Sequence, residues 1–164
     1  MVSVKLSDDQ VLDLISDIPD PEIPVITIRE LGMLQDVKLV NNEYVVTITP
    51  TYTGCPAMGM LEDQIRERLH GHGIDNVKVN LVYEPTWTTD WISDEAREKM
   101  RRYGISPPEK AKCNSELCGS LEMIHCPICN SSNASLISKF GSTACKALYK
   151  CGSCGEPFEH FKCH

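Results

Sequence analysis

Two Cys-x-x-Cys pairs in the last third of this 164-residue chain constrain its fold more than any other feature. They are Cys126-Pro-Ile-Cys129 and Cys151-Gly-Ser-Cys154, and the segment between them has the length of a β-ribbon. Because each pair places two sulfurs on one turn, the sequence predicts a tetrahedral four-thiolate site for structural zinc. So small a domain has too little apolar core to fold unaided, and metal binding supplies the missing free energy. A redox dithiol would not explain two pairs at this spacing.

Five further cysteines bring the total to nine, an odd number that fits disulfide pairing poorly. Without a secretion signal, this content points to metal or redox chemistry rather than to disulfides. Four of the five lie in the carboxyl-terminal part of the chain with several histidines, and their spacing matches no standard template. They could be incidental, or they could form a second and more labile metal site. These four residues are Cys113, Cys118, Cys145 and Cys163.

The composition is that of a globular protein, with 41% hydrophobic and 24% charged residues. No apolar run approaches the length of a membrane span, and the first residues lack the apolar core of a signal peptide. We therefore expect a cytoplasmic location. The net charge of −7 argues against a general nucleic-acid surface, which would need a clustered basic face.

The first part of the chain combines helical and strand periodicities. Apolar residues recur at helical steps in two segments and alternate in three others. The expected helices cover 7–17 and 56 to about 70, and the expected strands cover 33–40, 43–49 and 76–83. The order helix–strand–strand–helix–strand predicts an α+β fold, a small α/β sandwich in which helices cover one face of a mixed sheet.

Composition also predicts the domain boundaries. Residues 1–104 form the expected α/β domain, which ends with a trailing helix capped by Ser93. Residues 105–121 have the composition of a linker, and residues 122–164 form the expected zinc ribbon. Before the trailing helix, an extended segment holds both tryptophans, Trp87 and Trp91, which could pack over the sheet edge or form a docking surface.

The remaining cysteine outside the two pairs, Cys55, lies between the second expected strand and the second expected helix. Gly54 permits a tight bend and Pro56 suits a first helical position, so Cys55 is expected near the start of the helix. Unpaired backbone N–H groups and the helix dipole there favour a thiolate, which is the nucleophilic and metal-binding form. The segment therefore predicts a reactive thiol, with a small buried hydrophobe as the alternative.

A second candidate segment is the acidic turn that follows the first expected helix. Three prolines within six residues end that helix and stiffen the loop that carries Asp20 and Glu22. These carboxylates could serve a functional site. Alternatively, Asp20 could hydrogen-bond only its own turn, as aspartate commonly does.

The acidic turn and the cysteine loop together resemble the metal–sulfur cluster assembly domain family. The residues that carry the resemblance are Asp20-Pro-Glu-Ile-Pro24 and Thr51-Tyr-Thr-Gly-Cys-Pro56. Motifs at 85–91, 140–146 and 156–164 narrow it to the PaaD family of accessory subunits encoded with bacterial phenylacetyl-CoA epoxidase. The resemblance implies a small α/β fold, a reactive cysteine at Cys55, and an acidic motif at Asp20 and Glu22.

The resemblance also implies a maturation factor rather than an enzyme. Such a protein would assist assembly or insertion of an iron–sulfur cluster, or of iron, into the reductase or the di-iron oxygenase of the epoxidase complex. Its cofactors would be structural zinc and, transiently, iron or a cluster. A non-catalytic adaptor subunit is the main alternative. Whether the chain forms a homodimer is left open by the sequence. An enzyme with Cys55 as nucleophile is the weakest interpretation, since no histidine is convincingly placed as its base.

Overall fold

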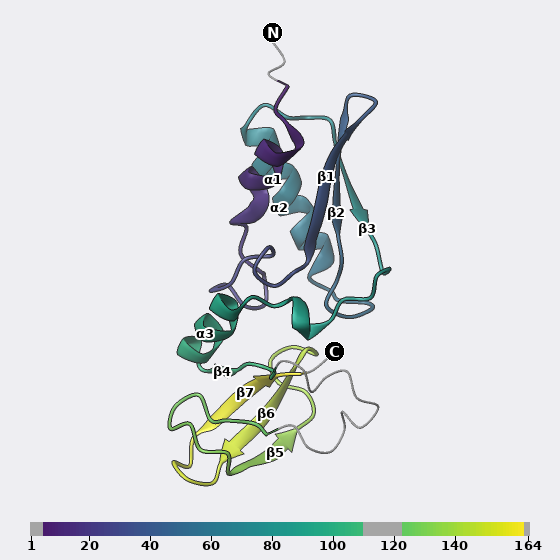
Figure 1. Ribbon diagram of the computed structural model, residues 1–164. Helices are drawn as coiled ribbons and strands as arrows, with labels where there is room; N and C mark the ends of the chain where they lie inside the picture. The colour runs from purple at the N-terminus through teal and green to yellow at the C-terminus, as the bar shows by residue number, and fades with distance from the viewer. Residues whose placement is uncertain (1–4, 110–122, 163–164) are drawn as a thin grey trace. The chain divides into compact units, whose positions relative to one another are not determined.

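A computed structural model describes residues 5–109 and 123–162 of the chain (Figure 1). The chain divides into two compact units, Met1–Trp87 and Thr88–His164, and each unit contains its own β-sheet. The expected boundaries near 104 and 121 stay a prediction. No helix within the described residues is long and apolar enough to span a membrane.

The sheet of the first unit has the strand order β1-β2-β3. β1 (Leu34–Val40) pairs antiparallel with β2 (Glu43–Ile48), and β2 pairs in parallel with β3 (Val77–Leu81). Asn41 and Asn42 join β1 to β2 with φ values of 50° and 68°, as a tight hairpin turn requires. The sheet is therefore mixed, as the sequence predicted.

Two helices lie on one face of this sheet (Figure 1). α1 (Asp8–Ser16) begins with a capping box, in which the Ser7 side chain accepts the N–H of Gln10 and the Gln10 side chain accepts the N–H of Ser7. α2 (Met58–Gly71) follows the cysteine loop. The core between the layers consists of buried apolar side chains that include Val11, Ile15, Val37, Val46, Ile48, Leu61, Ile65 and Leu69. The predicted α/β sandwich is confirmed.

The second unit contains a short 3₁₀ helix η1 (Thr89–Trp91), the helix α3 (Asp94–Tyr103) and a four-stranded sheet. The strands lie in the order β4-β7-β6-β5 and are β4 (Ile105–Ser106), β5 (Ala134–Ser138), β6 (Lys146–Cys151) and β7 (Pro157–Phe161). β5 and β6 form the ribbon between the cysteine pairs. Sequence periodicity did not indicate β7 or the two-residue β4, which pair with each other in parallel.

Trp87 is buried in the first unit, where its indole Nε1–H donates a hydrogen bond of 2.9 Å to the Leu31 carbonyl oxygen. Of the two roles expected for the tryptophans, packing is therefore confirmed for Trp87. Trp91 belongs to η1 in the second unit and is half-buried.

We expect Trp87→Ala to lower the free energy of unfolding of the first unit by about 3–5 kcal/mol, since it leaves a cavity and an unpaired Leu31 carbonyl. Chemical denaturation of the full chain, followed by circular dichroism, measures the change. Tyr83→Ala is the matched control, because Tyr83 lies in the same segment but is exposed. Similar losses in both variants would contradict a packing role for Trp87.

Candidate metal and thiol sites

The acidic turn is closed by the carboxylate of Asp20. Asp20 is buried, and its Oδ1 accepts the backbone N–H groups of Glu22 at 2.9 Å and Ile23 at 2.8 Å. The Asp20 N–H donates to the Ile26 carbonyl, and Pro19 forms a β-bridge with Thr27. Asp20 thus hydrogen-bonds within its own turn, which is one of the two roles that the sequence analysis left open. These bonds hold Glu22 in a defined loop.

The Cys55 loop bends at Gly54, where φ is 82°. α2 begins only at Met58, with Ala57 as the N-cap residue, so Pro56 precedes the helix and is not its first residue. The N–H of Cys55 donates to the Tyr52 carbonyl, and the Cys55 carbonyl accepts the N–H of Met58, both at 3.3 Å. These turns place Cys55 just before the amino-terminal end of α2.

The environment of Cys55 favours the thiol over the thiolate. Its side chain is buried, and this burial is the largest cause that raises the pKa of the Cys55 thiol above its ordinary value. The negative charges of Glu22 and Asp20 raise the pKa further, whereas hydrogen bonds from the Ala57 N–H and the Tyr52 side chain lower it. The prediction of a favoured thiolate was wrong, because burial and two carboxylates outweigh the start of the helix.

The fold thus brings Cys55 within electrostatic range of both predicted carboxylates. Sequence reasoning missed the contribution of Tyr52, although its position three residues before Cys55 in the same loop was a usable signal. The three donor groups are not a preformed metal cage. Within the described ranges, the one group of three or more metal-ligating side chains with clustered donor atoms is the cysteine tetrad of the ribbon.

The four tetrad sulfurs, from Cys126, Cys129, Cys151 and Cys154, lie within 4.8 Å of one another. The Sγ atoms of Cys126 and Cys154 are 3.8 Å apart, and those of Cys129 and Cys151 are 3.5 Å apart. Zn–S bonds of about 2.3 Å in a regular tetrahedron require sulfur separations of about 3.8 Å. The observed spacing therefore fits a zinc ion, which would act as a structural cross-link between the two pairs.

The two Cys-x-x-Cys turns have the same backbone geometry. The Cys126 carbonyl accepts the N–H of Asn130 at 2.9 Å, and the Cys151 carbonyl accepts the N–H of Gly155 at 3.0 Å. Asn130 and Gly155 have positive φ values of 60° and 81°, which return each chain away from the sulfurs. Two equivalent turns face each other across the tetrad, as expected for a zinc ribbon.

Proton affinity differs sharply within the tetrad. The backbone N–H groups of Cys154 and Ser153 point at the Cys151 sulfur and lower the pKa of that thiol to about 6. The Glu156 N–H lowers the pKa of Cys154, but burial and the other three sulfurs raise it to about 12. Four thiolates so close together repel one another, so full deprotonation requires a cation among them.

The ribbon has a small apolar core, in which Cys126, Cys151 and Phe158 are buried together. Ile124, Ala134 and Tyr149 pack against them only partly buried. Because two of the three buried residues are tetrad cysteines, loss of the metal would also loosen the core.

The second predicted metal site stays a prediction. Cys113, Cys118 and Cys163 lie outside the described residues. Cys145 is described and buried, and its Sγ lies 3.0 Å from the Thr143 hydroxyl oxygen. His160 is also buried in this unit, with its ring edge-on to Tyr149.

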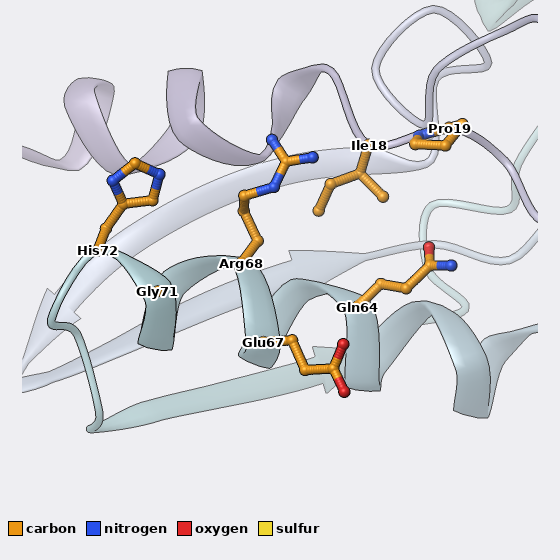
Figure 2. A pocket seen from close by; sticks show the side chains of 7 residues that line it. All are labelled: Ile18, Pro19, Gln64, Glu67, Arg68, Gly71 and His72. Carbon is orange, nitrogen blue, oxygen red and sulfur yellow. The ribbon is translucent and has the colours of Figure 1, made fainter.

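A groove of about 490 Å³ lies between α2 and the segment after α1. Figure 2 shows Arg68 on the helix, His72 just after its end, and Ile18 and Pro19 on the opposite side. Arg68 donates to the Leu14 carbonyl and to the Asp17 carboxylate, which ties α2 to the end of α1. The groove is lined by none of the three predicted thiol-site residues, and we assign it no chemistry.

Comparison with known proteins supports both parts of this description. Residues 8–82 match the model of an iron–sulfur cluster assembly protein family, and residues 110–162 match the PaaD zinc β-ribbon domain. Over 150 residues, the chain is 51% identical to a protein of Escherichia coli that is named as one of the subunits of a 1,2-phenylacetyl-CoA epoxidase. This match covers 92% of the chain and 89% of the relative. The chain belongs to the PaaD family.

Two further proteins resemble a shorter part of this PaaD-family chain. An Fe-S protein maturation auxiliary factor of Porphyromonas gingivalis is 32% identical over 92 residues, covering 55% of the chain and 87% of the relative. The structure of a conserved hypothetical protein from Thermotoga maritima has a TM-score of 0.50 and 31% identity, covering 60% of the chain and 98% of that protein. Residues 8–82, which contain Cys55, thus match an iron–sulfur cluster assembly family, and these two proteins match 55% and 60% of the chain.

We expect Cys55 to be alkylated slowly at neutral pH, with a midpoint above the ordinary cysteine value of about 8.5. Glu22→Gln should lower the midpoint, because it removes a negative charge that disfavours the thiolate. Iodoacetamide labelling across a pH series, read by mass spectrometry on zinc-loaded protein, measures both. Glu67→Gln on α2 is the charge-matched control. A midpoint below that of free cysteine would contradict this account.

We expect Cys154→Ser to abolish zinc binding by the ribbon and to unfold it, since three sulfurs cannot complete the tetrahedral set. Zinc analysis and limited proteolysis of the purified protein measure the two effects. Cys55→Ser is the control and should retain one zinc per chain. Equal zinc content in both variants would show that the tetrad does not hold the metal.

Proposed function

We propose that this chain is an accessory maturation factor that helps to assemble or insert an iron–sulfur cluster, or iron, into a subunit of phenylacetyl-CoA epoxidase. The observation that carries the proposal is the electrostatic effect on the Cys55 thiol of Asp20 and Glu22, two carboxylates from a distant segment. Sulfur and carboxylate oxygen are both iron ligands. The names of the relatives, a subunit of the epoxidase and an Fe-S maturation factor, agree with it.

The chemistry suits transient binding. Cys55 carries a proton that is held by burial and by two nearby negative charges, and a metal cation offsets both effects when it replaces that proton. The proton leaves to water as the sulfur binds the cation. Three donor groups that do not form a closed cage hold a metal centre incompletely, so its remaining positions stay open to ligands of the receiving protein.

The ribbon would serve a different purpose. Its four sulfurs form a closed tetrahedral set, which holds zinc permanently and has no open position for transfer. We therefore assign the metal of the tetrad to folding and the cargo to Cys55. The receiving subunit would be the reductase or the di-iron oxygenase of the epoxidase.

A structural adaptor is the second candidate function. The name of the Escherichia coli relative, which calls it a subunit of the epoxidase, favours this alternative. An adaptor would bind the complex stably and would not need Cys55.

The deciding experiment is co-expression of the chain with the reductase and the oxygenase, followed by purification without oxygen and analysis of iron and acid-labile sulfide. We expect Cys55→Ser to reduce the metal content of the receiving subunit to the level found without the chain, because the carrier thiol is lost. Met60→Ala, an exposed sulfur-containing residue of the same segment, is the control and should change nothing.

Zinc content and co-purification should be unchanged by Cys55→Ser, since the tetrad lies outside the first unit. Full metal content in the epoxidase despite Cys55→Ser would refute the maturation role. Loss of the complex only when the whole chain is absent would favour the adaptor.

A further inference from the structure

Exposed apolar side chains are concentrated on one short segment of the ribbon. Leu136 and Ile137 of β5 and the nearby Phe140 are 48%, 53% and 64% exposed. They are three of ten large exposed apolar residues in the described parts of the chain. Single exposed apolar residues are ordinary, but a group this close together in sequence on a small domain points to an interaction surface.

β5 is an edge strand, and β6 is its paired neighbour within the described sheet. The register shifts between Leu136 and Ser138, so Ile137 is the extra residue of a bulge and has no cross-strand partner. A bulge twists an edge away from continuous strand pairing and redirects side chains. The edge is therefore suited to contact through side chains rather than to the addition of a long strand.

Two lysines lie beside Phe140. Lys162 places its Nζ 4.6 Å from the centre of the Phe140 ring and donates to the Lys139 carbonyl at 3.2 Å. Lys139 itself is exposed and precedes Phe140 in the chain. We call the group Leu136, Ile137, Lys139, Phe140 and Lys162 the β5 patch.

The charge of the β5 patch indicates which kind of protein surface can bind to it. Its two lysines would face the same two lysines in a symmetric contact with a second copy, which disfavours self-association through this edge. An acidic surface with apolar side chains would satisfy both components of the patch. The cation–π contact of Lys162 also holds the Phe140 ring in place, which reduces the entropy lost on binding.

We propose that the β5 patch is the surface on which this chain docks its epoxidase client, through a client surface that combines carboxylates with apolar side chains. The inference rests on the proposed function, since it takes the client from it. It assigns recognition of the client to the ribbon and leaves Cys55 to handle the metal.

The test measures the affinity of the full-length zinc-loaded chain for the purified reductase and, separately, the purified oxygenase by titration calorimetry. We expect Ile137→Asp combined with Phe140→Asp to raise the Kd for one of them by at least about 30-fold, the loss typical of an interface hot spot. Lys139→Glu should weaken binding and reduce its dependence on salt, because a favourable charge is reversed.

Val40→Asp is the matched control, since it places the same charge at an exposed apolar position of the first unit. It should bind like the unmodified chain. Zinc content and thermal unfolding of each variant establish that the ribbon remains folded. If folded Asp variants bind as tightly as the unmodified chain, or if neither epoxidase protein binds it, the docking inference is wrong.

Analytical ultracentrifugation tests the alternative that a second copy of the chain binds to the β5 patch. A dimer that the two Asp substitutions dissociate, with no change in client affinity, would assign the patch to self-association and overturn the proposal. The proposed function is tested separately, by measuring the iron and sulfide content of the client that is co-expressed with the Cys55→Ser variant. That variant should keep full affinity for the client.

Discussion

Negative charges lie close together at both candidate sites of this chain. In the first unit, burial is the largest cause of the raised pKa of the Cys55 thiol, and the carboxylates of Asp20 and Glu22 raise it further. In the ribbon, four sulfurs lie within 4.8 Å of one another, and the pKa of Cys151 is about 6 whereas that of Cys154 is about 12. A bound cation would relieve the repulsion in either place.

The two sites differ in how completely they surround that charge. The ribbon sulfurs are spaced as the corners of a tetrahedron around zinc, and paired turns at Asn130 and Gly155 fix the backbone on both sides. Around Cys55, the acidic turn is held by hydrogen bonds within itself, chiefly those that Asp20 accepts. The carboxylates thus influence the thiol without closing over it. A closed set suits permanent binding, and an open set suits exchange.

Local signals predicted the elements well. The expected helix over 7–17, the expected strands over 33–40 and 43–49 and the two Cys-x-x-Cys pairs each depend on residues close in sequence, and each appears in the structure. Long-range effects could not be predicted in this way. The raised pKa of Cys55 depends on its burial and on carboxylates from another segment, and β7 is recognisable only from its pairing with β6. The position of Cys55 before α2 suggested the opposite pKa shift.

Charge also explains why recognition and metal handling would belong to separate surfaces. The chain carries a net charge of −7, and its thiol site adds two carboxylates around Cys55, so an acidic client would be repelled there. The β5 patch offers lysines beside exposed apolar side chains, which can hold such a client while a cation at Cys55 offsets the local negative charge. Once the cation had passed to the client, the repulsion at the thiol site would return. A cation bound at Cys55 would therefore strengthen binding of the client, and transfer of that cation to the client would weaken it.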